Sequence, residues 1–277
     1  MTASPHSSPN GPLTLLFLHA HPDDESILSG ASIAKATSLG HKVIVAFATP
    51  GDAGETKQDL GGITLGERRE QEAQAACLAL KVSEAIFLGY DDSGMADTET
   101  TANPSAFCNT DLDGFAMRLS AVLDGQNIDA VIGYDSNGTY GHPDHIKIHE
   151  AAHRVAPILG ADWVLEVTYN RDYLASLEES PYGDTIDENF ATAAADVTHF
   201  VEGPEWFEAK VEALKHHTSQ TPDDWDPDDK QQTIGFAKAF GTEWFSAFPI
   251  TDTANPADLA GWLEPKDRWS GAPPVPD

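Results

Sequence analysis

The amino-acid sequence predicts an α/β fold with a mostly parallel sheet made of Rossmann-like crossover units. Short apolar runs alternate with helical patterns as far as residue 170, which is typical of parallel strands joined by crossover helices. No repeat of the solenoid type interrupts this order. With 277 residues, of which 40% are hydrophobic, the chain can form one large domain around a sizeable core.

The expected strands are short, mainly apolar runs, and the first of them contains "LTLLFL". The strands are expected at 13–19, 42–48, 84–89, 128–133 and 162–169. Helices are expected at 26–39, 66–80, 110–124, 144–157 and 204–217. Apolar residues recur on one helical face: Ala73, Ala76, Cys77 and Leu80 in the second helix, and Leu112, Phe115, Leu119 and Val122 in the third. The helix at 204–217 begins with Pro, which suits a first turn.

The chain divides into a central domain and two terminal segments. Residues 1–12 are rich in Ser, Pro and Gly and are expected to form a flexible lead without the features of a signal peptide. Residues 13–265 are expected to form a single domain, with its Rossmann-like core at 13–170 and a less regular C-terminal portion at 171–265. Residues 266–277 end in a Pro-rich run and are expected to be a flexible tail.

The composition excludes several classes of partner. Asp and Glu exceed Lys and Arg by 45 to 16, so neither nucleic acid nor a membrane is expected to bind. The acidic run "TPDDWDPDDK" lacks the Gly and terminal Glu of an EF-hand loop and is expected to be a solvated loop. Cys77 and Cys108 are expected to be unpaired, which favours the cytoplasm.

Two histidine-containing segments follow predicted strands. "HAHPDDES" (19–26) follows the first strand, and "YGHPDH" (140–145) follows the fourth. Ligands of open α/β sheets bind beyond the carboxyl ends of the strands. Both segments contain His-Pro-Asp and both precede a helix. We therefore expect the two segments to form one site.

The residue types in these segments suit a metal ion. On the first segment alone, helix capping by the acids and metal binding both remain open. His21 and Asp24 can supply two ligands from one helical turn, and His142 or His145 can complete the three ligands that a catalytic zinc takes. Asp23 would then be free to accept a proton from metal-bound water, as in metal-assisted hydrolysis. Iron(II) is an alternative to zinc, because His and Asp suit both ions.

"AHPDDE" (20–25) together with "GHPDH" (141–145) resembles the LmbE/PIG-L-like zinc-dependent N-deacetylases. The resemblance is closest to the branch that contains mycothiol deacetylase and mycothiol S-conjugate amidase. It covers residues 13–170 and reappears at "ALKHHTSQ" (213–220). It implies an LmbE-like deacetylase fold. The roles that it implies are zinc binding by His21, Asp24 and His145, general-base catalysis by Asp23, oxyanion stabilisation by His142 and Tyr140, and orientation of a histidine by Asp144.

Fainter matches suggest substrate contacts. "TPGDAGE" suggests Glu55, "RREQE" suggests Arg69, "LGYDDSGM" suggests Asp92, and the late "KHHTSQ" suggests His217. The mycothiol branch usually has a basic residue where Asp91 stands, and this difference leaves the exact substrate open.

Three other histidines are expected to lie outside the ligand set. His19 precedes the motif on the strand and is expected to be packed and hydrogen-bonded. His149 and His153 have the spacing of helical zinc ligands but lack the neighbouring Glu of that motif, so they are expected to be surface residues.

The resemblance implies an enzyme that hydrolyses the amide of an N-acylated amino sugar, most simply by N-deacetylation of an N-acetylglucosaminyl compound. An amidase that cleaves a larger acyl group from a thiol conjugate is a second hypothesis, because it would share the metal site. A metal- or sugar-binding protein without turnover is the third, and Asp23 argues against it because zinc binding alone does not need that residue. A homo-oligomer is left open.

Overall fold

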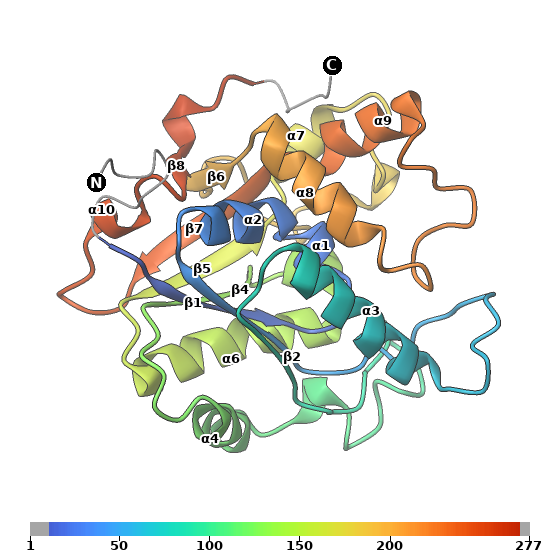
Figure 1. Ribbon diagram of the computed structural model, residues 1–277, viewed down its shortest axis with the longest axis horizontal. Helices are drawn as coiled ribbons and strands as arrows, with labels where there is room; N and C mark the ends of the chain where they lie inside the picture. The colour runs from blue at the N-terminus through green and yellow to red at the C-terminus, as the bar shows by residue number, and fades with distance from the viewer. Residues whose placement is uncertain (1–10, 272–277) are drawn as a thin grey trace.

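The computed structural model describes residues 11–271, which form a sheet with helices on both faces (Figure 1). The strand order is β3-β2-β1-β4-β5-β7-β6-β8. The strands are β1 (Thr14–His19), β2 (Lys42–Phe47), β3 (Glu84–Phe87), β4 (Ala130–Tyr134), β5 (Trp163–Thr168), β6 (His199–Val201), β7 (Glu243–Pro249) and β8 (Glu264–Pro265). Strands β1 to β5 pair in parallel, which confirms the predicted mostly parallel α/β sheet.

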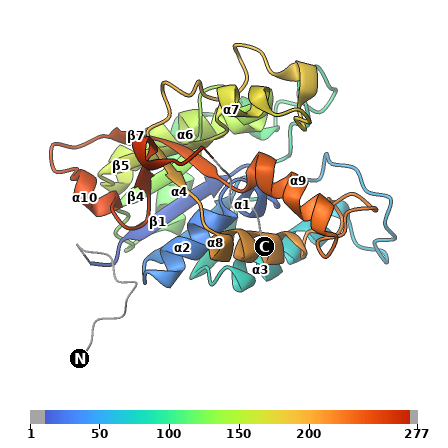
Figure 2. The ribbon, with the colours of Figure 1, turned by 90° about the horizontal axis from the view of Figure 1, so that it is seen from above.

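The helices form two layers around the sheet. Helices α4 and α6 lie against one face, and α2, α3 and α8 lie side by side over the other (Figure 2). The α-helices are α1 (Asp24–Ile27), α2 (Gly30–Ser38), α3 (Leu65–Ala79), α4 (Leu112–Val122), α5 (Gly138–Gly141), α6 (Pro143–Leu159), α7 (Arg171–Ser176), α8 (Pro204–Leu214), α9 (Lys230–Phe240) and α10 (Pro256–Leu259). Because both faces are covered, the central strands are mainly apolar, and Leu15 to Leu18 are fully buried.

The prediction of one helix at 26–39 is wrong in one respect. The structure has two helices there, because α1 ends at Ile27 and α2 begins at Gly30. The carboxylate of Glu243 on β7 accepts hydrogen bonds from Ala31 N at 2.9 Å and Ser32 N at 2.8 Å. This carboxylate satisfies free N–H groups at the start of α2. The cap comes from a residue more than 200 positions away, so local sequence could not indicate it.

Strand β7 was missed in the sequence, although it extends the sheet past β5. Its residues, "EWFSAFP", mix aromatic side chains with Glu and Ser, so the segment does not stand out as an apolar run. Glu243 is buried here because it pairs with Lys210 of α8 at 2.9 Å. Strands from 13–170 and 171–265 thus share one sheet.

The structure describes residues 11–12 of the predicted lead and residues 266–271 of the predicted tail. Residues 1–10 and 272–277, most of the predicted lead and half of the predicted tail, lie outside the described residues. Within the predicted tail, Lys266 N donates to Thr198 O at 2.9 Å and Trp269 packs against Trp244. Val122, predicted to face the core, is 46% exposed because α4 ends there. None of the helices within 11–271 has the length and apolarity needed to cross a membrane.

Candidate metal site and its surroundings

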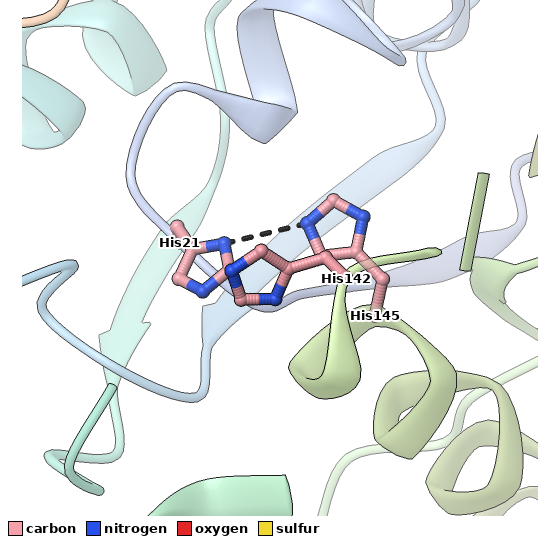
Figure 3. Close-up of side chains that lie close together, drawn as sticks. All are labelled: His21, His142 and His145. Atoms are coloured by element: carbon pink, nitrogen blue, oxygen red, sulfur yellow. Dashed lines mark hydrogen bonds between the residues drawn. The ribbon is translucent and has the colours of Figure 1, made fainter. Parts of the chain in front are cut away.

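The two histidine-containing segments meet at the carboxyl edge of the sheet. Strands β1 and β4 are parallel neighbours, with Leu16 opposite Val131, so both segments leave the sheet at the same edge. Figure 3 shows the rings of His21, His142 and His145 pointing toward one another, His21 from the turn after β1 and the others from the start of α6. The predicted meeting of the two segments is confirmed.

The three predicted ligands form a nearly equilateral triangle. His21 Nδ1 lies 3.5 Å from Asp24 Oδ2, Asp24 Oδ2 lies 3.4 Å from His145 Nε2, and His145 Nε2 lies 3.3 Å from His21 Nδ1. Tetrahedral ligands at the usual zinc distances of about 2.0–2.1 Å are roughly 3.4 Å apart. The donor set therefore fits one zinc-sized ion without rearrangement. All three side chains are buried.

The far side of the His21 ring is held by two carboxylates. Nε2 lies 3.3 Å from Asp144 Oδ2 and 3.4 Å from Asp92 Oδ1. Burial opposes a charge on His21, but the carboxylates of Asp144, Asp24 and Asp92 outweigh it and raise the His21 pKa well above its usual value. A carboxylate on the outer nitrogen directs the other nitrogen toward a metal. Asp144 has the geometry predicted for it, whereas Asp92 is buried against His21 rather than open to substrate.

Asp24 is held by two hydrogen bonds. Its Oδ2 accepts from His21 N at 2.9 Å and from the Tyr134 hydroxyl at 2.8 Å. Burial would raise the Asp24 pKa, but His145 and His21 lower it well below the usual value. Asp24 is therefore ionised as a ligand must be. Tyr134 was not singled out in the sequence, and only its place at the end of the fourth strand could have drawn attention to it.

Asp23 lies beside the triangle without belonging to it. Its side chain is 18% exposed, and its Oδ2 accepts from Arg69 Nη2 at 3.2 Å. Its φ of 110° places the backbone in the left-handed region, where non-glycine residues are rare. Burial raises the Asp23 pKa to about 6, although Arg69 opposes the shift. The strained turn thus directs Asp24 and Asp23 to different positions.

Arg69 is a buried support of this turn. Its Nη1 donates to Gly51 O at 2.7 Å and its Nη2 donates to Pro22 O at 2.6 Å. A Cβ on Gly51 would lie 2.4 Å from the guanidinium, so only glycine leaves room for Arg69. The sequence suggested Arg69 as a substrate contact, but its Nη1 and Nη2 donate to Asp23 and to the backbone.

Glu25 and His217 form a fully buried ion pair behind Asp23. His217 Nε2 lies 2.6 Å from Glu25 Oε1, and Glu25 Oε2 accepts from Asp23 N at 3.0 Å. Burial would lower the His217 pKa, but Glu25 outweighs it and raises the pKa. The sequence suggested His217 as a substrate contact, but in the structure its ring pairs with Glu25. Glu25 stands in the motif, yet its role depends on a residue 192 positions away.

We expect His217→Ala to reduce the free energy of unfolding by roughly 3–5 kcal/mol, because it leaves the buried Glu25 carboxylate without its cationic partner. Urea denaturation of the purified variant measures this loss. His216→Ala is the control, since His216 is exposed and adjacent. Unchanged stability together with a raised KM would instead make His217 a substrate contact.

Tyr140 and His142 border the triangle. The Tyr140 ring centroid lies 5.0 Å from that of His145, and the His142 centroid lies 4.5 Å from that of His21. His142 Nδ1 accepts from Asp144 N at 3.2 Å, so a neutral ring carries its proton on Nε2. Burial and the neighbouring His21 lower the His142 pKa to about 3. His142 therefore offers an N–H donor beside the triangle.

Glu55 differs from the other suggested substrate contacts because it is exposed. It lines a polar pocket of about 280 Å³ together with Gln58, Ser219 and Gln220. Its carboxylate is accessible to a solute, in contrast to Asp92 and His217.

Among the three histidines expected to lie outside the ligand set, the prediction is confirmed for His19 and wrong for His149 and His153. His19 is buried, and its ring contacts the Tyr134 hydroxyl and Ser29 Oγ, both at 2.9 Å, as expected for a packed residue. His149 and His153 are half-buried rather than surface residues, because both contact Glu166 of β5, at 3.0 and 2.7 Å. These three side chains also have the spacing of metal ligands.

We expect Glu166→Gln to lower the free energy of unfolding by about 1 kcal/mol near pH 6 and by less at pH 9. The effect is small because the ion pair of His149 and Glu166 is partly exposed. The hydrogen bond that the His149 ring donates to the Glu166 carboxylate raises the His149 pKa. A raised histidine pKa stabilises the fold fully below the unfolded-state pKa, and this stabilisation is lost as pH rises through the folded-state pKa. Denaturant titrations at both pH values measure the difference, with Glu208→Gln as an exposed control. A loss of equal size at both pH values would contradict this assignment.

Comparison with protein families gives a match over the Rossmann-like core. The model described as "PIG-L: GlcNAc-PI de-N-acetylase" matches residues 16–156, which include both histidine-containing segments. A protein of Geodermatophilus obscurus named 1D-myo-inositol 2-acetamido-2-deoxy-alpha-D-glucopyranoside deacetylase is 33% identical, covering 94% of this chain and 98% of that protein. A protein of the same name from Saccharomonospora viridis is 37% identical, covering 74% and 84%.

Solved structures share the fold at low sequence identity. N,N'-diacetylchitobiose deacetylase from Pyrococcus horikoshii has a TM-score of 0.54 and 21% identity, covering 87% of each chain. The 4-carboxy-2-hydroxymuconate hydratase GalB from Pseudomonas putida has a TM-score of 0.57 and 16% identity, covering 88% of this chain and 99% of that one. Because a hydratase shares the fold with a deacetylase, the fold alone does not define the reaction.

Proposed function

The chain belongs to the GlcNAc-PI de-N-acetylase (PIG-L) family, and on this premise we propose that it is a metal-dependent amide hydrolase acting on N-acylated amino sugars. The observation that carries the proposal is the triangle of His21, Asp24 and His145 with an unliganded carboxylate, Asp23, beside it. Three ligands leave a fourth position, as in catalytic zinc sites. A site that only bound metal would not need Asp23.

The proposed metal is zinc, with iron(II) as the alternative, because imidazole and carboxylate ligands suit both ions. When bound, such an ion would polarise the amide carbonyl and lower the pKa of a water molecule in the site. The surrounding hydrogen bonds support this role, since Asp144 and Tyr134 orient His21 and Asp24.

The side chains suggest a division of the proton transfers. Asp23 accepts a proton from the attacking water as its oxygen adds to the amide carbon. His142 Nε2–H and the Tyr140 hydroxyl donate hydrogen bonds to the developing oxyanion. Asp23, once protonated, can return the proton to the leaving amine as the C–N bond breaks. Arg69 and Glu25 keep Asp23 in the strained turn that makes this possible.

The proposed substrate class, N-acylated amino sugars, includes N-acetylglucosaminyl compounds. The two curated relatives are named as deacetylases of such a compound, and Glu55 borders a polar pocket suited to hydroxyl groups. A cytoplasmic location is supported by Cys77 and Cys108, which are free thiols.

The proposal is tested by incubating the zinc-loaded chain with N-acetylglucosaminyl-inositol and with simple N-acetylglucosamine glycosides. Release of equal amounts of acetate and free amine is the expected result. If a chain that holds one zinc ion released neither acetate nor amine, the hydrolase proposal would be wrong and a binding protein would be favoured.

We expect His142→Ala to reduce kcat by about 10²–10³-fold, the usual effect of losing one oxyanion donor. Metal content should stay at the native level, because His142 is outside the proposed ligand set. Steady-state kinetics and atomic emission measure the two quantities, and His216→Ala serves as an exposed control. Loss of the metal from His142→Ala would show that His142 is itself a ligand.

A further inference from the structure

An apolar pocket lies directly beside Asp23 and differs from the polar pocket that Glu55 lines. Its volume is about 220 Å³. Its walls come from the end of α1, the end of α8, the loop that follows it and α9. The side chains that matter are Asp23, Ile27, Leu214, Pro222, Trp225 and Phe236. Asp23 is the only charged residue among those that line it.

The far wall of this pocket is a packed structure. Trp225 and Phe236 rest on a separate cluster formed by Phe207, Val211 and Ala237, which are buried. The Phe236 ring centroid lies 5.9 Å from that of Phe207. The pocket therefore has a preformed apolar wall, as binding sites for apolar groups usually have.

An acetyl group would leave most of this pocket empty. A methyl group is close in size to a water molecule, whose share of liquid volume is about 30 Å³, whereas the pocket measures about 220 Å³. Sugar hydroxyls do not suit it either, because unpaired polar groups lose hydrogen bonds in apolar surroundings. The polar pocket, which shares Gln220, Thr221 and Pro222 with it, is better suited to the sugar.

The covalent structure of the substrate decides which part reaches the pocket. In an N-acyl amino sugar, the acyl chain begins at the carbonyl carbon, which must lie next to Asp23 for water to attack it. The anomeric substituent is separated from that carbon by the amide nitrogen and two ring carbons. A pocket lined by Asp23 itself is therefore reached first by the acyl chain.

We propose that this pocket is an acyl-binding subsite and that the chain prefers N-acyl amino sugars whose acyl group is apolar and longer than acetyl. This inference rests on the proposed function. The reaction is unchanged: water adds its oxygen to the carbonyl carbon, the C–N bond breaks, and the products are a longer carboxylate and the free amine.

The test is a series of methyl glucosaminides with N-acetyl, N-propanoyl, N-butanoyl and N-hexanoyl groups, assayed with the zinc-loaded full chain. We expect kcat/KM to rise about fourfold for each added methylene until the pocket is filled. Thr221→Phe, which fills the pocket, and Trp225→Ala, which removes a wall, should both lower the ratio of hexanoyl to acetyl kcat/KM. Leu78→Ala is the matched control, because Leu78 is an exposed apolar residue on α3.

The possible outcomes separate this inference from the proposed function. Turnover of the N-acetyl compound with falling rates for longer chains would refute the acyl subsite and leave the deacetylase proposal intact. A higher kcat/KM for octyl N-acetylglucosaminide, without a higher kcat/KM for longer acyl groups, would assign the pocket to the aglycone and refute the inference. No turnover of any N-acyl compound would refute both. Thermal unfolding of Thr221→Phe and Trp225→Ala checks that each variant is folded.

Discussion

Asp23→Asn is expected to reduce kcat by about 10²–10⁴-fold while the chain retains its metal, because loss of a general base typically costs that much. An amide cannot accept the proton that the attacking water releases. Asn has nearly the shape of Asp, so the strained turn and its hydrogen bond to Glu25 should persist. Release of acetate and amine measures turnover, and atomic emission measures the metal.

Two controls make this result interpretable. Asp228→Asn removes a carboxylate from the exposed acidic loop and should leave turnover and metal content unchanged. Thermal unfolding of Asp23→Asn tests whether Arg69, which loses a charged partner, disturbs the fold. Native turnover in a correctly folded Asp23→Asn chain would show that another group accepts the proton. The proposed mechanism would then be wrong at its central step.

The positions of the metal ligands could be predicted because they depend on local and topological rules. The first and fourth apolar runs had to be parallel strands, and parallel strands end at one edge of a sheet. His21 and Asp24 lie within five residues of the end of β1, and His145 lies eleven residues after the end of β4, in the first turn of α6. The distance between the two segments along the chain was therefore no obstacle. The structure confirms that the segments meet.

The surroundings of the site could not be predicted in the same way, because they depend on long-range burial. Arg69, Asp92 and His217 were suggested as substrate contacts because the stretches around them resemble those of the family. In the fold their partners are Asp23, His21 and Glu25. Whether a charge faces solvent or a buried partner depends on segments such as α8, which lies far from the motifs in sequence.

The same limit explains the elements missed after residue 170. Glu243 looks like a surface residue in the sequence, but it pairs with Lys210 and caps α2. Its burial is tolerated because its charge and its hydrogen bonds are both satisfied. A pattern search that assigns charged residues to the surface therefore places this strand outside the sheet.

Asp24→Asn is expected to weaken metal binding at least about 100-fold, because loss of even an outer-shell partner costs roughly 10–100-fold. The amide oxygen carries no full charge to offset that of the cation. It can still accept the Tyr134 hydroxyl, so the fold around it should survive. Competition with a chromophoric chelator measures the affinity, and turnover at limiting zinc should fall in parallel.

The comparison with His142→Ala decides which residues hold the ion. His21, His142 and His145 also bring their ring nitrogens within 4.8 Å of one another, so three histidines are a second arrangement that the geometry permits. If Asp24 is a ligand, Asp24→Asn releases the metal and His142→Ala keeps it. The reverse pattern would assign the ion to the three histidines. In that case Asp24 would serve only to hold His21 and His145, since its carboxylate lies 3.5 and 3.4 Å from their nitrogens.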